Sequence, residues 1–169
     1  MKSTTIVCLV ALLSGVVLTA GCLNVVNKAN GGGTFISEEF SINAGDLVNF
    51  GFNVKFDSET NIATVQFQLT DQVTGQTVHV SNMTMINLTE LGIPLPPPSP
   101  EMPNAVFFTG YDRNGKLVIV SAIDAGEPGP SADDGILVWY DVESVYEVIS
   151  EQEMPTWAGI LQEGNIQTH

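Results

Sequence analysis

The sequence predicts an all-β fold, a β-sandwich of the jelly-roll or immunoglobulin-like kind. Two segments, residues 47–56 and 62–69, alternate apolar and polar residues over much of their length, which is typical of half-buried strands. Turn signals separate the apolar segments; Asn114-Gly115 is the strongest, because both residues tolerate positive φ. No long segment has a convincing helical period. Short strands joined by such turns favour a sandwich.

Three further strands complete the predicted body. Residues 77–80 follow a turn at 74–76, and residues 117–123 and 136–142 are apolar on both faces, which suits central strands. Residues 144–154 form either one short helix or another strand, and residues 151–169 are candidates to return to the sheet. The apolar positions predict a buried core of Val48, Phe50, Phe52, Val65, Phe67, Leu69, Val118, Val120 and Leu137.

The N-terminus has the parts of a secretory signal. Lys2 is the only charge before an apolar stretch over residues 5–18, which is too short to span a bilayer comfortably. The segment Leu18-Thr19-Ala20-Gly21-Cys22 resembles the lipobox of bacterial lipoproteins, although Thr19 replaces the usual leucine. The resemblance implies cleavage before Cys22 and acylation of that residue. The alternative is an ordinary signal peptide that happens to contain a cysteine.

This interpretation divides the chain into a signal peptide at 1–21, a flexible glycine-rich tether at 22–34 and a single domain at 35–169. We expect an exported protein that is lipid-anchored to the cell envelope, in the outer membrane if the organism has one. Cys8 would leave with the signal, so the mature chain has no partner for an internal disulfide.

The charge balance excludes one class of partner. The mature chain would carry four basic residues against 19 acidic ones, a net charge of −15. Nucleic acid is not expected as a partner, because phosphate binding requires a basic surface. An anionic bilayer would repel the domain, so the membrane is reached through the acyl chains on Cys22. Solubility alone explains this acidity at least as well as any specific partner does.

The order of motifs in the body resembles a cohesin domain, the β-sandwich of cellulosome scaffoldins. The segments that carry the resemblance are Ala44-Gly45-Asp46-Leu47-Val48, the strand at 61–69, the hairpin and strand at 112–120, and the loop and strand at 124–138. Together they cover roughly residues 42–143. The sequence departs from cohesins at 70–75, where a plain hairpin replaces the usual Tyr-Asp-Pro and its apolar anchor, and at the proline-rich segment 93–103.

A cohesin presents one sheet face to a dockerin, a small calcium-loaded helical protein. The resemblance implies that the strands at 62–69, 116–123 and 135–142 form this face. The expected binding residues are Thr64, Gln66, Gln68, Leu117 and Ile119.

Two other classes remain open. The first is a carbohydrate-binding or adhesion module with an aromatic platform at Tyr111, Tyr140 and Trp157, with Trp139 assigned instead to the core. The second is a structural envelope lipoprotein. The segment 93–103 must be polyproline II or loop, either as a peptide ligand or as a stiff connection.

Catalysis is not expected. His79 and His169 are the only histidines, and no nucleophile elbow, zinc-binding His-Glu-x-x-His pair or phosphate loop is present. Calcium is the one metal to consider. The loop 124–134 offers four carboxylates as oxygen ligands: Asp124, Glu127, Asp133 and Asp134. The turn at 112–115 resembles half of an EF-hand loop. The alternative for the loop 124–134 is a polar segment held by Asp-to-backbone bonds.

Overall fold

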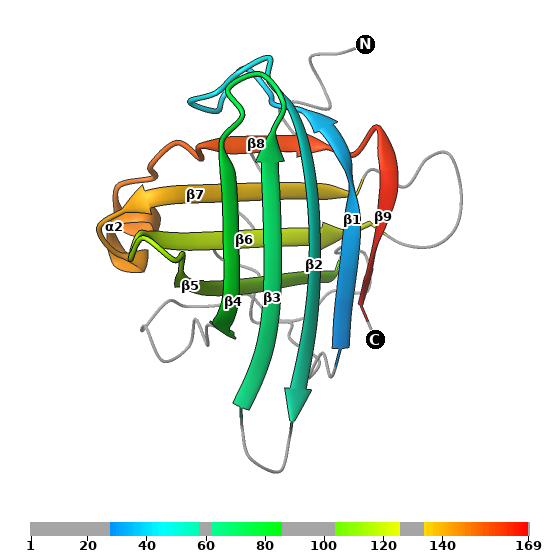
Figure 1. Cartoon of the computed structure of the whole chain (residues 1–169), viewed down its shortest axis with the longest axis vertical. Helices are drawn as coiled ribbons and strands as arrows, with labels where there is room; N and C mark the ends of the chain where they lie inside the picture. The colour runs from blue at the N-terminus through cyan, green and yellow to red at the C-terminus, as the bar shows by residue number, and fades with distance from the viewer. Residues whose placement is uncertain (1–27, 58–61, 86–103, 126–133, 169) are drawn as a thin grey trace.

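The described residues form nine antiparallel strands and one short helix, which confirms the predicted all-β sandwich. A computed structural model describes residues 28–57, 62–85, 104–125 and 134–168 (Figure 1). The elements are β1 (Lys28–Ile36), β2 (Leu47–Asp57), β3 (Ile62–Asp71), β4 (Thr77–Met85), β5 (Asn104–Tyr111), β6 (Leu117–Asp124), β7 (Gly135–Val142), α2 (Val145–Ser150), β8 (Trp157–Ile160) and β9 (Glu163–Thr168). The predicted segment at 93–103 lies outside the described residues.

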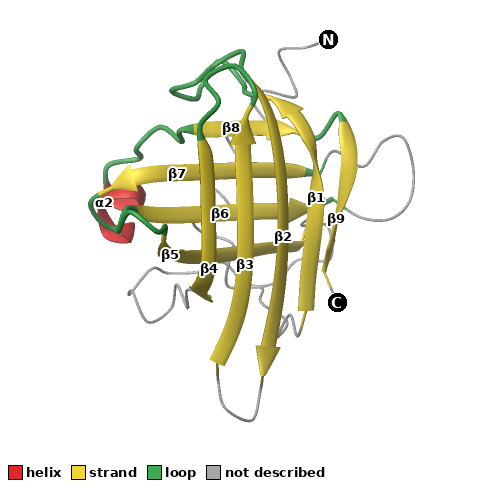
Figure 2. Cartoon of the chain, viewed as in Figure 1, coloured by secondary structure: helices red, strands yellow, loops and turns green. Residues whose placement is uncertain are grey.

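The strands are joined as a meander that folds over on itself. Strands β1 to β8 are neighbours in chain order, and β9 returns to pair with β1. We call β9-β1-β2-β3-β4 the first sheet and β4-β5-β6-β7-β8 the second. The two share β4, which pairs with β3 along most of its length and with β5 at Thr84 and Met85. Figure 2 shows β5 to β8 running across the strands of the first sheet.

This connectivity corrects the finer part of the fold prediction. Jelly rolls and immunoglobulin-like sandwiches use Greek-key connections, in which a strand skips over its sequence neighbours. Among the described strands, each of β1 to β8 instead lies beside the next. Hairpin turns make this possible: Gly75 and Gly115, in two of the predicted turns, have φ of 73° and 78°, which glycine adopts without a steric penalty.

The core lies between the two sheets and contains all nine residues predicted for it except Leu137. Leu137 is buried in a second cluster on the other side of the second sheet. Aromatic rings join the sheets: Phe108 of β5 lies 5.5 Å from Phe52 and 6.1 Å from Phe67, between ring centroids. Since these rings come from both sheets, their packing holds the layers together.

The short helix α2 covers part of the second cluster, which confirms the helical alternative for residues 144–154. The Ser144 hydroxyl accepts a hydrogen bond from the Glu147 N–H at 3.1 Å, which caps the helix α2. Val148 then lies in the same buried cluster as Ile119 and Trp139.

The expected tether at 22–34 is wrong over residues 28–34, because these residues form most of β1. The glycines at 31–33 are there for close packing. A Cβ atom on Gly33 would lie 2.1 Å from the Glu163 carbonyl oxygen, and one on Gly31 would lie 2.6 Å from the Phe52 ring. A glycine-rich composition by itself predicts a flexible linker. Only the pairing of β1 with β2 and β9 shows that these residues form a strand.

Candidate functional site

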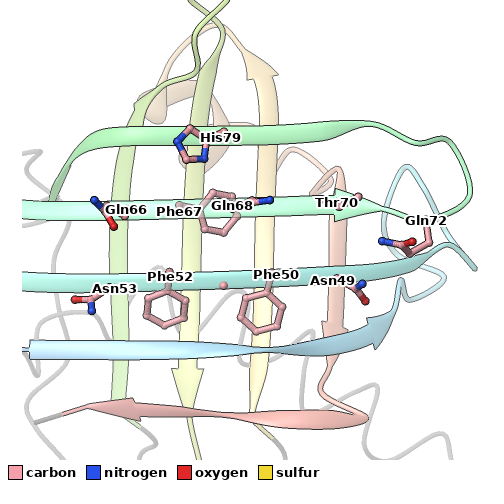
Figure 3. A pocket seen from close by; sticks show the side chains of 11 residues that line it. Asn49, Phe50, Phe52, Asn53, Gln66, Phe67, Gln68, Thr70, Gln72 and His79 are labelled. Atoms are coloured by element: carbon pink, nitrogen blue, oxygen red, sulfur yellow. The ribbon is translucent and has the colours of Figure 1, made fainter.

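The outer face of the first sheet carries an open groove lined by amide, hydroxyl and imidazole side chains. The groove has a volume of about 570 Å³ and lies over β2, β3 and β4 (Figure 3). Its polar lining alternates with the core residues of the same strands, as the period of a strand requires. The polar lining residues are Asn49, Asn53, Gln66, Gln68, Thr70, Gln72 and His79.

Strand register aligns these side chains into rows across the sheet. In one row, Gln167 of β9 pairs with Asn30, Asn30 with Asn53, and Asn53 with Gln66. Directly opposed residues on one face have Cβ atoms about 4.5–5.5 Å apart. Four amide groups therefore lie side by side across four strands.

A second row contains two glycines at its centre. Asn165 pairs with Gly32, Gly32 with Gly51, Gly51 with Gln68, and Gln68 with His79. Because Gly51 has no side chain, the middle of this face is hollow. A Cβ atom on Gly51 would meet only the Gly31 carbonyl oxygen, at 3.9 Å. The fold therefore has room for a side chain at this position.

The two ends of the face differ in character. At one end, Lys28 pairs directly with Lys55, which pairs with Thr64, and all three are exposed. At the other end, the paired residues Ile36 and Leu47 are 45% and 41% exposed. The face thus runs from a cationic end through the amide rows to an apolar end.

Three of the predicted binding residues lie on this face, and two do not. Thr64, Gln66 and Gln68 are exposed on β3, and the two glutamines line the groove. Leu117 and Ile119 are buried in the second cluster. Their strand β6 belongs to the second sheet, so the three strands expected to form one face do not share one. The prediction for Leu117 and Ile119 is therefore corrected.

Sequence reasoning missed the rest of the groove. Asn49 and Asn53 alternate with the core residues of β2, and His79 does so in β4. That alternation was visible in the sequence. What could not be seen was the register that places them beside Gln66 and Gln68.

The three residues predicted as an aromatic platform differ in how far they are exposed to a ligand in solvent. Tyr111 is 65% exposed, whereas Trp157 is fully buried and donates from its indole N–H to Asp71 at 3.1 Å. Tyr140 is half-buried and donates its hydroxyl to Asp112 at 3.0 Å. Trp157 is thus corrected to a core residue. Trp139 is buried, as predicted.

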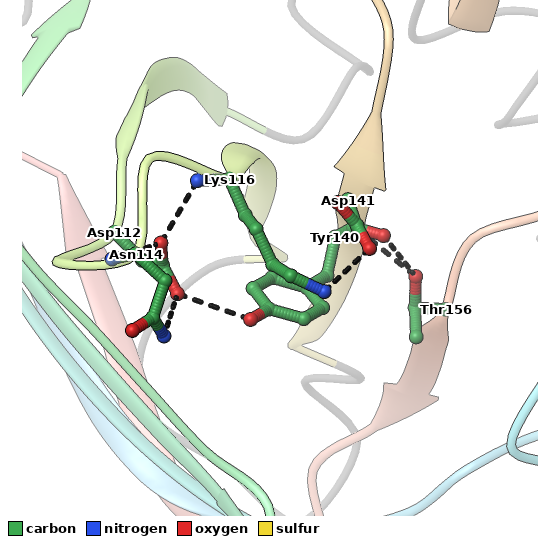
Figure 4. A network of polar contacts seen from close by, with 6 residues as sticks. All are labelled: Asp112, Asn114, Lys116, Tyr140, Asp141 and Thr156. Carbon is green, nitrogen blue, oxygen red and sulfur yellow. Dashed lines mark hydrogen bonds and ion pairs between the residues drawn. The ribbon is translucent and has the colours of Figure 1, made fainter.

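Asp112 organises the turn that resembled half of an EF-hand loop (Figure 4). Its carboxylate accepts the backbone N–H groups of Asn114 and Lys116 at 2.8 and 2.9 Å, as well as the Tyr140 hydroxyl. Burial by itself would raise the pKa of Asp112, but these hydrogen bonds outweigh it and hold the pKa below its usual value. Burial of Tyr140, together with its hydrogen bond to Asp112, raises the pKa of the Tyr140 hydroxyl. Both oxygens of Asp112 are engaged by the protein itself.

The proposed calcium loop is described at only two of its four carboxylates, since Glu127 and Asp133 lie outside the described residues. Asp134 is buried and accepts the N–H groups of Ala125 at 3.0 Å and Ile166 at 2.6 Å. Asp124 is also buried. Within the described part of the chain, no three His, Cys, Asp or Glu side chains are grouped to hold a metal. One of these bonds, from Ala125, lies within the loop, and the other ties the loop to β9.

Another buried carboxylate, Asp71, links the end of β3 in the first sheet to β8 in the second. Asp71, at the end of β3, is fully buried and accepts the N–H groups of Val73 at 2.9 Å and Thr74 at 3.0 Å, in addition to the Trp157 indole. Burial by itself would raise the pKa of Asp71, but these bonds lower it below its usual value. Burial, together with a hydrogen bond to Asp71 and its charge, raises the pKa of neighbouring Asp46.

Fold and groove together define a class: a two-sheet, all-β protein with an amide-lined groove on the outer face of one sheet. Comparison with known proteins finds no family model, no curated protein and no solved structure that matches the chain. Among the described residues, no helix has the length and apolar character needed to cross a membrane.

Proposed function

We propose that this chain is a lipid-anchored, extracytoplasmic binding module that holds a carbohydrate chain in the groove of the first sheet. The observation that carries the proposal is the set of aligned amides around a glycine-floored hollow. Each Asn or Gln side chain offers both donors and an acceptor. Sugar hydroxyls also donate and accept, so amides can satisfy them without a charge.

The same lining argues for a carbohydrate over a protein partner. The centre of a protein interface is rich in aromatic and apolar side chains. In this groove the rings of Phe50, Phe52 and Phe67 belong to the core and are almost fully buried. The lining side chains that reach solvent are amides, a hydroxyl and an imidazole. A dockerin-type partner remains a prediction of the sequence resemblance alone.

The lining also favours binding without catalysis. His79 is the one titratable side chain among the residues that line the groove. Glycoside hydrolysis usually requires a pair of carboxyl groups on either side of the scissile bond. We therefore propose a module that retains a glycan at the envelope and leaves it intact.

Binding should be measured on the mature chain, residues 22–169, carrying Cys22→Ser so that it is soluble. A form starting at residue 34 would lack most of β1. Isothermal titration with hexasaccharides of glucose, xylose and galacturonate would test the proposal. The double variant Gln66→Ala with Gln68→Ala should weaken binding about 30-fold, since each lost hydrogen bond costs about 1 kcal/mol.

Gly51→Val provides a steric test with a clear control. Valine suits a strand and has room at this position, so the fold should be kept or slightly stabilised while the hollow is filled. Ser81→Val adds similar bulk at an exposed position of β4 that does not line the groove. Binding should be lost with Gly51→Val and kept with Ser81→Val. A wild type that binds none of the three sugars, or a Gly51→Val variant that binds as well as wild type, would show the proposal to be wrong.

A further inference from the structure

The cationic end of the outer face of the first sheet indicates what kind of carbohydrate the groove on that face receives. From residue 22 onward the chain has four basic residues: Lys28, Lys55, Arg113 and Lys116. Lys116 forms an ion pair with Asp141 at the end of the second sheet. Lys28 and Lys55 instead lie together on the outer face of the first sheet. Half of this positive charge is thus gathered at one end of one sheet face, next to the groove.

These two lysines are direct cross-strand partners. Like charges in this arrangement repel and destabilise a sheet. Among the described residues, no ion pair joins either lysine to an acidic side chain. An acidic residue at either position would have turned the repulsion into attraction, and this chain has 19 acids elsewhere. The pair therefore costs stability in the free protein, and a bound anion would relieve the repulsion.

The lysine pair forms the next row of this face, just beyond the residues that line the groove. Lys28 and Lys55 lie two residues along their strands from Asn30 and Asn53, on the same face. Two residues of a strand span about 6.5 Å, so the ammonium groups can reach a ligand that lies along the amides. Asp57 ends β2 two residues beyond Lys55, and its side chain lies outside the described ones.

We propose that the ligand is an acidic oligosaccharide, with a carboxylate-bearing sugar held between Lys28 and Lys55 and further sugars hydrogen-bonded to the amide rows. This inference rests on the proposed function of the groove. The exposed apolar pair Ile36 and Leu47 lies at the opposite end of the face. Because the two ends differ in charge and polarity, the glycan binds in one direction, with its acidic unit at the start of β1.

An anionic lipid headgroup is the other partner that the lysines could attract. From Cys22 to Lys28 there are six residue steps, which reach about 20 Å when extended at about 3.3–3.6 Å per residue. A lipid anchor at Cys22 would therefore keep this end of the domain near the bilayer. The glycan is favoured because the lysines extend the amide rows on the same face, while the acidic domain as a whole is repelled by an anionic surface.

The test compares hexagalacturonate with the neutral hexasaccharides, using the soluble mature chain and its Lys28→Gln, Lys55→Gln double variant. Wild type should bind the acidic sugar about tenfold more tightly at low salt, because charged hydrogen bonds are stronger than neutral ones. The double variant should lose that preference and its salt dependence while still binding neutral sugars. Lys116→Gln is the matched control and should behave as wild type. The melting temperature of each variant verifies that the fold is kept.

Each outcome decides a different point. Equal binding of neutral and acidic sugars by wild type would overturn the inference and leave the proposed function intact. If no sugar binds, the proposed function fails and this inference fails with it. Vesicles of phosphatidylglycerol provide the last arm. If wild type binds the vesicles and the double variant does not, while the sugar preference is unchanged, the lysines serve the membrane and the inference is overturned.

Discussion

Two neighbouring carboxylates should respond to the same chemical change with opposite signs. Asp71→Asn and Asp46→Asn each remove one negative charge and keep the side-chain shape. Asp71 accepts three hydrogen bonds as a buried carboxylate, whereas Asp46 is a neighbour whose raised pKa reflects burial and the presence of Asp71. At neutral pH we expect Asp71→Asn to destabilise the protein and Asp46→Asn to stabilise it.

The magnitude for Asp71 follows from its bonds. An amide at this position has one acceptor oxygen, so it cannot serve both the Val73–Thr74 turn and the Trp157 indole, and its NH₂ faces a donor. A hydrogen bond to a charged group contributes about 1.5–3 kcal/mol, and the bonds that remain would be weaker because the acceptor is neutral. Relief of repulsion with Asp46 offsets part of this loss. We expect a net loss of about 2 kcal/mol, or a fall in melting temperature of about 4–8 °C for a domain of this size.

A double-mutant cycle would test the bond between Asp71 and the Trp157 indole. Its four proteins are the wild type, Asp71→Asn, Trp157→Phe and the double variant, each unfolded by heat and by urea. In the phenylalanine background the indole donor is gone, so Asp71→Asn should cost less than in wild type, by on the order of 1 kcal/mol. Equal costs in both backgrounds would refute the role of the indole bond. If Asp46→Asn also destabilised the protein at pH 7, the assignment of opposite roles to the two carboxylates would be wrong.

Three other predictions follow from the described contacts. Phe67→Ala should cost about 3–5 kcal/mol, because the ring is enclosed between both sheets; chemical denaturation measures this, and a loss below 1 kcal/mol would contradict the packing. Asp71 and Asp112 have lowered pKa values, so their stabilisation is present above the unfolded-state pKa of about 3.9 and is lost as pH falls through the folded-state values. A melting temperature that does not fall between pH 5 and pH 2 would contradict this. Cys22→Ser should release the protein from membranes or block its processing, as fractionation can verify; an unmodified cysteine in the wild type would refute the lipid anchor.

Local pattern was sufficient to predict the strands at 47–56, 62–69, 77–80, 117–123 and 136–142, all of which lie within observed strands. Alternation is a property of a strand by itself, so it can be read before any partner is known. The same holds for the turns at Gly75 and Gly115, which depend on backbone conformations available to glycine. The exposed positions Thr64, Gln66 and Gln68 follow from the same alternation.

Tertiary structure decided which of these faces meet, and this is where the sequence was misleading. The glycines at 31–33 resemble a linker until β2 and β9 pair on either side of them and leave no space for a Cβ atom at Gly31 or Gly33. Leu117 and Ile119 resemble a contact surface until the helix α2 packs over the same side of the second sheet. The strand order was not predicted either, because alternation determines the two faces of a strand and does not determine which strands lie beside it.

The sequence by itself determined that this protein is an all-β sandwich with phenylalanines in its core and polar side chains on the outer side of the strand at 62–69. It could not determine the groove, because a groove needs Gly51, Gln68 and His79 in one row across three strands. It could not determine the role of Asp71 either, whose partner Trp157 lies 86 residues away along the chain. Periodicity is encoded between neighbours in sequence, whereas register and long-range hydrogen bonds are set by the packing of the whole chain.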